Sequence, residues 1–482
     1  MSPQDTIERA LAVAQSDDCV VIADETSSAN LRWAGNTLTT NGVSRSRQLT
    51  VVAISRSGEA TSVGVVSRAG VTDDQIEDVV RAAEKAASES SAAEDARPLL
   101  TPHDPETFRM DAYAGSGGPA WDDPVKGTEI GIFGGFASAL GRAFESAASA
   151  GRKLYGFAEH SVTNTFVGTS AGLRLRHDQP AGKVDLNAKS ADLARSAWVG
   201  TGTRDFSDID VAALDTDLGR RLDWAARQVK LPAGRYETIL PPTAMADLLV
   251  YLYWSSGAKD ALDGRTVFSK PGGGTRVGER LANLPVTLRS DPDAVGLRCA
   301  PFVIAHASSR ASSVFDNGLA LHPTAWIRDG DLTALVQTRH TAHLTGLPVT
   351  PAIGNLILDG PGPASRHNGS ADNGASLDDM IASTGRGLLL TCLWYIREVD
   401  PQTLLLTGLT RDGVYLVENG EVTGAVNNFR FNESPVAMLG RLAAVGTTVP
   451  TLPREWGDDF TRTAMPPARV EGFNMSSVSQ AS

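Results

Sequence analysis

The chain has 482 residues, of which 41% are hydrophobic and 21% charged, and its formal net charge is −12. This length predicts roughly two to four globular domains, and the hydrophobic fraction is ample for their cores. The acidic balance argues against a nucleic-acid-binding surface, because neutralising phosphates requires clustered Lys and Arg and the sequence has no such run.

Cysteine use and the N-terminal residues predict a reducing, cytoplasmic location. Cys19, Cys299 and Cys392 are far apart and form no CxxC pair, so a disulfide framework is not expected. Residues 1–21 carry acidic side chains where a secretory signal needs a basic segment and a long apolar one. The longest apolar stretches, such as residues 387–396, reach only about half of the roughly 20 residues that a membrane-spanning helix needs. We therefore expect neither export nor membrane insertion.

Residues 1–108 are expected to form an N-terminal α+β domain. Residues 6–16 have helical spacing, and β-rich runs separated by turn residues follow within 19–67. Thr72 then precedes acidic residues and apolar side chains at helical spacing. This arrangement predicts an amphipathic helix with Thr72 as its N-cap.

A stretch rich in Gly, Pro and Asp at residues 109–127 predicts a boundary, after which a central α+β segment extends to residue 220 (109–220). Within this segment we expect a helix over 130–150, followed by alternating strands up to about residue 190. A turn is expected between these strands at residues 168–172.

Residues 221–460 are expected to form a β-rich C-terminal domain with a few helices, one beginning near Pro242 and a last one over 434–446. Residues 461–482 are expected to be an irregular tail that frays at its end. The predicted fold class is therefore α+β, with one or more N-terminal α/β-type domains followed by a β-rich C-terminal domain.

Residues 168–172 read GTSAG and match the G-x-S-x-G nucleophile elbow of hydrolases. That motif requires a strand, a sharp turn and then a helix, so that the serine projects above a sheet. Here β-like runs flank the motif on both sides, which predicts a hairpin with Ser170 in an ordinary turn. Ser170 is therefore only a minor candidate for a nucleophile.

His340 and His343 lie three positions apart, so on a helix they would share one face and could share a metal ion. No acidic or cysteine ligand lies close by in the sequence, although distant residues could supply one. The chain has eight histidines, and one such pair arises easily by chance. Ordinary surface or interface residues are the favoured interpretation.

Residues 239–257, ILPPTAMADLLVYLYWSSG, predict a strand end, a turn and a strongly apolar helix. Pro242 suits the first helical turn and Gly257 can end the helix. The segment contains no His, Glu or Cys, and Asp247 is its only carboxylate. Hydrolysis by a metal ion needs at least three protein ligands and a base that activates water, which this helix cannot supply.

Segments in both halves of the chain match, in order, the pattern of one known family. VYLVENGEV at 414–422 and SLDDMIAS at 376–383 are similar to a strand–turn–strand and a helix of its C-terminal part. NLRWAGNTLTTNG at 30–42 and the helix after Thr72 are similar to its first domain. On these segments the chain resembles the TldD/TldE (PmbA) family. It departs from the family over TCLWYIREVDPQTLLLTGLTRDG at 391–413, where only LTGLTRDG at 406–413 remains of the family's pattern, and this leaves the substrate-contacting residues unassigned.

The resemblance implies one of two kinds of subunit. TldD-type chains carry H-E-x-x-x-H on a helix after a strand, and a Cys near the C-terminus, and these hold the zinc of a peptidase. TldE-type chains lack the ligands and pair with a TldD-type chain. Placing the family's strand–helix unit on this sequence puts the metal-site positions at Val250, Tyr251 and Ser255, and residues 453–467 contain no Cys.

The resemblance therefore implies a non-catalytic TldE/PmbA-like subunit of a heterodimeric zinc metalloprotease that degrades or processes unfolded peptides. It implies no catalytic residue, metal ligand or cofactor in this chain, with zinc held by a TldD-like H-E-x-x-x-H partner. Charge and the length of the apolar runs, as above, predict neither nucleic acid nor membrane as a partner. Two alternatives stay open: an independently active hydrolase that uses Ser170, His340 or His343, and a stand-alone peptide-binding regulatory module.

Overall fold

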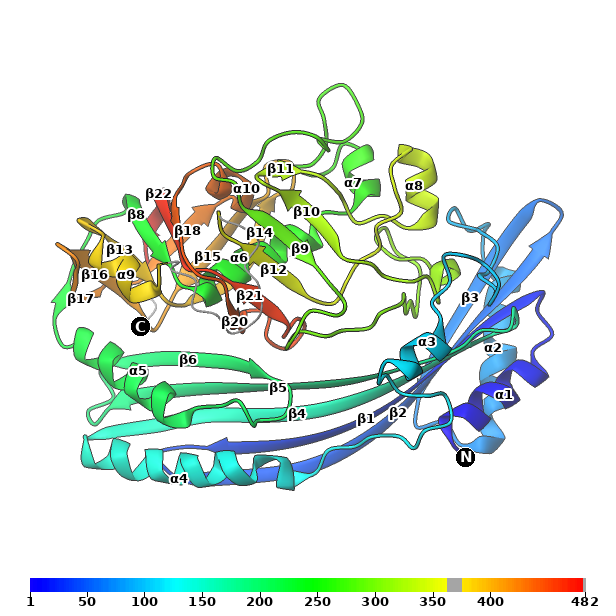
Figure 1. Cartoon of the computed structure of the whole chain (residues 1–482), viewed down its shortest axis with the longest axis horizontal. Helices are drawn as coiled ribbons and strands as arrows, with labels where there is room; N and C mark the ends of the chain where they lie inside the picture. The colour runs from blue at the N-terminus through cyan, green and yellow to red at the C-terminus, as the bar shows by residue number, and fades with distance from the viewer. Residues whose placement is uncertain (362–374, 480–482) are drawn as a thin grey trace.

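The computed structural model describes residues 1–361 and 375–479, which form three β-sheets with helices packed against them. The N-terminal half supplies one long, curved sheet, and the C-terminal half supplies the other two, which lie together over one side of it (Figure 1). The fold is a mixed α+β fold, as predicted.

The long sheet has six antiparallel strands. Its strands are β1 (Asp18–Trp33), β2 (Leu38–Ser57), β3 (Ala60–Ala69), β4 (Arg152–Thr169), β5 (Arg174–Ser190) and β6 (Ser196–Thr203), in the order β3-β2-β1-β4-β5-β6. Strand β1 pairs with β4 from Val20 opposite Thr169 to Trp33 opposite Gly156. One sheet thus joins strands from the predicted N-terminal and central segments.

The second sheet also has six strands. They are β9 (Thr287–Ser290), β10 (Thr324–Arg328), β11 (Asp331–Leu332), β12 (Leu356–Asp359), β20 (Val449–Thr451) and β21 (Thr463–Met465), in the order β11-β10-β9-β12-β21-β20. Its last two strands come from the end of the chain, so the sheet brings together residues that are far apart in the sequence.

The third sheet has ten strands, and β14 is the strand at one of its two edges. Its strands are β7 (Gln228–Val229), β8 (Gly234–Leu240), β13 (Arg386–Leu390), β14 (Leu393–Asp400), β15 (Leu405–Thr410), β16 (Val414–Glu418), β17 (Glu421–Val426), β18 (Phe429–Glu433), β19 (Leu442–Val445) and β22 (Ala468–Val478). The order is β14-β15-β18-β22-β8-β13-β16-β17-β7, and β19 pairs with β22.

Helices flank these sheets. They are α1 (Pro3–Val13), α2 (Ile76–Glu89), α3 (Met110–Gly115), α4 (Gly134–Ser149), α5 (Val211–Trp224), α6 (Pro242–Trp254), α7 (Ala258–Leu262), α8 (Arg339–Thr345), α9 (Leu377–Ala382) and α10 (Pro435–Leu439), with short 3-10 helices at Asp73–Gln75, Ile130–Phe133 and Val314–Asp316. The expected capping box at Thr72 is present. Within the described ranges, no helix is both long enough and apolar enough to cross a membrane.

The long sheet buries both of its faces, because successive side chains of a strand point to opposite sides. Val21 and Leu31 of β1 pack in the clusters formed with α1, α2, α4 and α5. Val20 and Ile22 of the same strand pack on the other side, in a cluster that includes Phe315 of the C-terminal half. Figure 1 shows α4 and the C-terminal sheets on opposite sides of the long sheet. The sheet is therefore the layer that joins the two halves.

The end of the chain is not the irregular, frayed tail that we predicted. Residues 463–478 contain β21 and β22, and β22 pairs with β8, β18 and β19 inside the third sheet. The alternation of buried and exposed residues along β22 fits a strand, but its place at the end of the sequence suggested disorder. Partner strands supplied by distant residues order the segment. Residues 480–482 of the predicted tail lie outside the described residues.

The predicted last helix, 434–446, is also shorter than expected. Helix α10 covers only Pro435–Leu439, because Gly440 ends it and Leu442–Val445 form β19 against β22. Pairing with a distant strand thus overrides the local helical spacing.

Gly64, in β3, lies against α2 without room for a side chain. A Cβ atom there would lie 2.1 Å from the carbonyl oxygen of Ala83 and 2.2 Å from the amide nitrogen of Ala87. Because both are backbone atoms, the variant Gly64→Ala has to push α2 away from the sheet. We expect it to lower the free energy of unfolding by about 1–3 kcal/mol, the usual cost of overpacking, as measured by urea denaturation.

Gly42→Ala is the matched control in the same sheet. A Cβ atom at Gly42 would meet only the side chain of Asn30, at 3.6 Å, which is an ordinary contact. We expect its free energy of unfolding to stay within about 0.5 kcal/mol of the wild type. Equal losses in the two variants would contradict the close approach of α2 to β3.

Candidate functional site

Helix α6 follows β8 directly and is buried on nearly every side. Pro242 occupies its first turn, and nine of its 13 residues are buried. It contacts β8 of the third sheet and β20 and β21 of the second. A helix that is apolar all round belongs to a core rather than to a surface. The apolar helix predicted from the sequence is therefore a central packing element.

The three metal-site positions suggested by the resemblance have structural tasks in α6. Val250 is fully buried in the main core cluster of the C-terminal half. The ring of Tyr251 packs against that of Trp456, with centroids 5.6 Å apart. The Oγ of Ser255 donates a hydrogen bond to the carbonyl oxygen of Tyr251 at 2.9 Å, at the C-terminal end of the helix.

These side chains do not fit a zinc ion, which takes nitrogen, thiolate or carboxylate ligands. Val250 offers only hydrocarbon. Burial raises the pKa of the Tyr251 phenol above its ordinary value, so the phenol keeps its proton. The Ser255 hydroxyl is already engaged with the backbone. In residues 1–361 and 375–479, no group of three or more His, Cys, Asp or Glu side chains is arranged to hold a metal ion.

Residues 453–467, the stretch that lacks the family's C-terminal Cys, lie directly against α6. The backbone N–H of Glu455 donates to Oδ1 of Asp247 at 2.9 Å, and the indole Nε1 of Trp456 donates to the carbonyl oxygen of Asp247 at 2.8 Å. The Trp456 ring also packs on Trp254, with centroids 5.2 Å apart. The structure thus brings together the two segments in which ligands were expected and not found, and aromatic rings fill the space between them.

Asp247 is a buried carboxylate in this apolar surrounding. It is 1% exposed, and its Oδ2 has no hydrogen-bond partner in the part of the chain that the structure describes. Burial raises the pKa of Asp247 well above its ordinary value, a shift that the backbone N–H of Glu455 and the charge of Arg454 oppose and the charge of Glu455 reinforces. The sequence pointed to Asp247 only as the single carboxylate of the helix.

Beside α6, the edge strand β14 exposes large apolar side chains. We call Trp254, Trp394, Tyr395 and Val399 the aromatic edge; their exposed fractions are 43%, 37%, 53% and 56%. Tyr395 has a φ of 57°, and the pairing of β14 with β15 shifts register there, so this residue forms a bulge that points its ring outward. Exposed apolar patches of this kind mark interaction surfaces.

Arg454 anchors the aromatic edge to the long sheet. Its guanidinium lies 4.5 Å from the ring centre of Trp394 and 5.2 Å from that of Trp198 in β6. A cation over the face of an aromatic ring is attracted to it, so Arg454 links the two rings. Sequence reasoning missed Arg454 and Trp456, and the only signal for them was the aromatic and charged run PREWGDD at 453–459.

Ser170 lies in the turn between β4 and β5, which form the predicted antiparallel hairpin. Its Oγ accepts a hydrogen bond from the backbone N–H of Cys19 at 3.0 Å and donates one to Oδ1 of Asp18 at 3.1 Å. The strand–turn–helix geometry of a nucleophile elbow is therefore absent at this serine, and its hydroxyl ties the hairpin to the start of β1.

His340 and His343 lie on one helix, α8, as their spacing allowed. His343 is exposed, while both ring nitrogens of His340 are buried without a hydrogen-bond partner in the described ranges. The two rings therefore face different environments.

Cys392 is buried, as expected for a core thiol, and burial raises its pKa to about 12. A thiol with such a pKa remains protonated near neutral pH and is neither a good nucleophile nor a good metal ligand.

Comparison with known proteins identifies the family to which this architecture belongs. The profile of the PmbA/TldA metallopeptidase C-terminal domain matches residues 233–477, which is more than half of the chain. The chain belongs to the PmbA/TldD family. The family suggested by the sequence motifs is thus confirmed. A comparison with curated protein sequences gives no match.

Solved structures of the same fold extend over the whole chain. TldE from Thermococcus kodakarensis is 16% identical, with a TM-score of 0.74 over 98% of this chain and 99% of its own. A putative modulator of a DNA gyrase from Thermotoga maritima is also 16% identical, with a TM-score of 0.74 over 98% of this chain and 100% of its own. One from Bacteroides thetaiotaomicron is 14% identical, with a TM-score of 0.73 over 99% of this chain and 98% of its own. At these identities the likeness establishes a shared fold.

The raised pKa of Asp247 predicts how stability depends on pH. The folded chain holds the proton of Asp247 more tightly than the unfolded chain does, so this contribution to stability is fully present below the pKa of an unfolded aspartate. It is lost as pH rises toward the folded pKa. Asp247→Asn keeps an oxygen that can accept from Glu455 and has no proton to lose. We therefore expect the stability of Asp247→Asn relative to the wild type to increase as pH rises from about 4 to about 8, measured by urea denaturation.

Asp122→Asn, at an exposed aspartate, is the control, and its free energy of unfolding should follow the wild type at each pH. If the difference between Asp247→Asn and the wild type does not change with pH, Asp247 is not the buried, protonated group that the geometry indicates.

Proposed function

We propose that this chain is a non-catalytic, TldE-like subunit of a two-chain zinc peptidase, whose partner is a TldD-like chain that carries H-E-x-x-x-H. The observation that supports this most directly is which side chains α6 carries at the expected metal-site positions. At the three metal-site positions, Val250 fills the core, Tyr251 packs on Trp456 and Ser255 caps the helix. The scaffold of a family metal site is built here from side chains that hold the fold together.

In this proposal the two chains divide the work. Zinc in the partner would supply the Lewis acid and the activated water for hydrolysis of an unfolded peptide. This chain would contribute surface: an extended peptide can add to a sheet edge through its backbone, which grips many sequences equally well. The long sheet and the C-terminal sheets would then form walls that admit only unfolded chains.

We further propose that the aromatic edge is the surface that meets the partner. Trp254 and Trp394 are exposed, yet they are held in place by Trp456 and Arg454 respectively. Rings that are already ordered lose little conformational entropy on binding, and aromatic residues are enriched at the centres of interfaces. The edge also lies beside the α6 positions that correspond to the partner's zinc helix.

The division of work is tested by separating the chains. We expect the purified chain alone to contain no stoichiometric zinc by elemental analysis and to leave unfolded peptides intact. Added to a TldD-like chain with an intact H-E-x-x-x-H motif, it should form a complex that hydrolyses them.

Variants Ser170→Ala, His340→Ala and His343→Ala serve as controls, and none should reduce the activity of the complex. Tightly bound zinc together with peptidase activity in the isolated chain would contradict the proposal. Loss of activity in one of the three variants without any partner present would favour an independent hydrolase. Failure to recover an H-E-x-x-x-H chain by pull-down from a native lysate would favour a stand-alone peptide-binding module.

A single charged substitution tests whether the aromatic edge is the surface that meets the partner. Val399→Asp places a carboxylate on the aromatic edge, where it would be desolvated on binding. We expect it to weaken the affinity for the partner by about tenfold or more without changing the melting temperature. Val43→Asp is the matched control, since Val43 is also an exposed valine on a strand, β2, with 48% of its surface accessible. Equal affinities of the two variants for the partner would contradict this assignment of the interface.

A further inference from the structure

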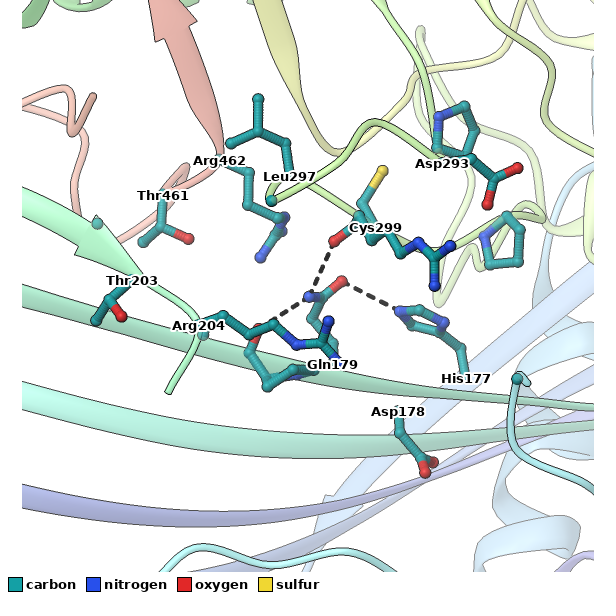
Figure 2. Close-up of a pocket in the computed structure, with 18 of the residues that line it drawn as sticks. His177, Asp178, Gln179, Thr203, Arg204, Asp293, Leu297, Cys299, Thr461 and Arg462 are labelled. Atoms are coloured by element: carbon teal, nitrogen blue, oxygen red, sulfur yellow. Dashed lines mark hydrogen bonds between the residues drawn. The ribbon is translucent and has the colours of Figure 1, made fainter. Parts of the chain in front are cut away.

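A cavity of about 430 Å³ lies between the long sheet and the C-terminal half. Its walls come from β5, β6, the loop at residues 292–301 and the segment at residues 461–463 (Figure 2). None of the residues that line it belongs to α6 or β14, so it is separate from the site described above. Cavities of this size commonly hold small ligands or the ends of larger ones.

Arg462 lines this cavity as a partly buried cation without a counter-ion. Its Nε donates to the carbonyl oxygen of Gly354 at 3.1 Å, and no carboxylate in the described part of the chain forms an ion pair with its guanidinium. Burial lowers the pKa of Arg462 below its ordinary value, which reflects the cost of keeping this charge out of water. Buried guanidiniums are ordinarily paired with an anion, so the terminal nitrogens of Arg462 are available to a ligand.

Two more arginines line the same cavity. Arg204 and Arg298 likewise form no ion pair within residues 1–361 and 375–479. Figure 2 shows the side chains of Arg204 and Arg462 approaching Gln179 from two sides. Many arginines of this acidic protein are engaged by carboxylates or aromatic rings, whereas these three line one cavity without such a partner among the described residues.

The floor of the cavity is polar and neutral. Nε2 of Gln179 donates to the carbonyl oxygens of Pro180 at 2.9 Å and Arg298 at 3.3 Å, and its Oε1 lies 3.1 Å from Nε2 of His177. Burial lowers the pKa of His177, so the ring is neutral near pH 7 and the bond to Gln179 Oε1 assigns its proton to Nε2. This chain of bonds fixes Gln179 between the two arginines.

Acidic residues in the wall offset only part of the positive charge of the three arginines. Asp178 is already paired, with Arg176 at 2.8 Å and Lys126 at 3.5 Å. Asp208 accepts a hydrogen bond from the hydroxyl of Thr203. These carboxylates and the exposed Asp293 would repel a doubly charged phosphate about twice as strongly as a singly charged carboxylate.

We propose that this cavity binds a carboxylate of a peptide, held by the guanidiniums of Arg462 and Arg204. The carboxylate comes either from the C-terminus of the peptide or from an acidic side chain. The fork of a guanidinium matches the two oxygens of a carboxylate, which gives both charge and geometry. That the ligand is a peptide rests on the proposed function; that it is a carboxylate rests on the cavity alone.

The test uses the full chain without partner or zinc, so its result does not depend on whether a heterodimer forms. Four N-acetylated peptides of otherwise identical sequence are titrated by calorimetry: a free C-terminal carboxylate, a C-terminal amide, and the amide with a central Glu or a central Gln. We expect the free carboxylate to bind at least about tenfold more tightly than the amide, since a charge-assisted hydrogen bond is lost in the amide. If the central Glu, but not Gln, restores the affinity of the amide, an acidic side chain is the source.

Arg462→Gln should remove the difference between the carboxylate and amide peptides. Arg204→Gln, at an exposed position that does not threaten folding, should reduce this difference in affinity between the carboxylate and amide peptides by about threefold or more. Arg328→Gln, an exposed arginine on β10 outside the cavity, is the matched control and should leave it unchanged. The proposal is overturned if the peptides do not bind, if all four bind equally, or if Arg204→Gln and Arg328→Gln behave alike.

Discussion

The burial of helix α6 is the constraint on which the C-terminal half depends. Because nearly every face of α6 is apolar, the second and third sheets both have to supply surface to it, and residues 453–467 have to cover its remaining side. Polar side chains on a helix in this position are costly unless a partner satisfies them; the N–H of Glu455 satisfies Oδ1 of Asp247, while Oδ2 has no partner among the described residues. The same position that would suit a shielded metal site in a family member therefore suits a hydrophobic core here.

The long sheet has the complementary task of joining the two halves. Its strands bury one face under α1, α2, α4 and α5 and the other face against the C-terminal half, so it is a two-sided layer rather than the core of one separate domain. Its edge strand β6 meets the C-terminal half at Trp198, where Arg454 lies between rings of the first and third sheets. This junction connects the aromatic edge to the rest of the molecule.

Two different sites follow from this arrangement, and they have opposite character. The α6 region is apolar, with one buried carboxyl group whose pKa is raised by burial, and it presents aromatic rings at its surface. The cavity between the halves is polar, and its three arginines form no ion pair with any residue in the described part of the chain. The two proposed roles, a surface for a protein partner and a cavity for a carboxylate, are compatible in one chain, since one would place the chain and the other would place the substrate.

The sequence by itself determined the features that depend on neighbouring residues. The amphipathic helix after Thr72, the hairpin around Ser170 and the apolar helix after Pro242 were predictable, because their periodicity and turn chemistry are local. The family also was predictable from ordered motifs. Strand β22, the short helix α10 and the cavity were not. Trp456 meets Asp247 across 209 positions and Arg462 meets Gly354 across 108, and no local pattern encodes such pairs. Tertiary structure alone decided which polar groups are buried and which charges go unpaired, because desolvation depends on everything packed around a group and not on its neighbours in sequence.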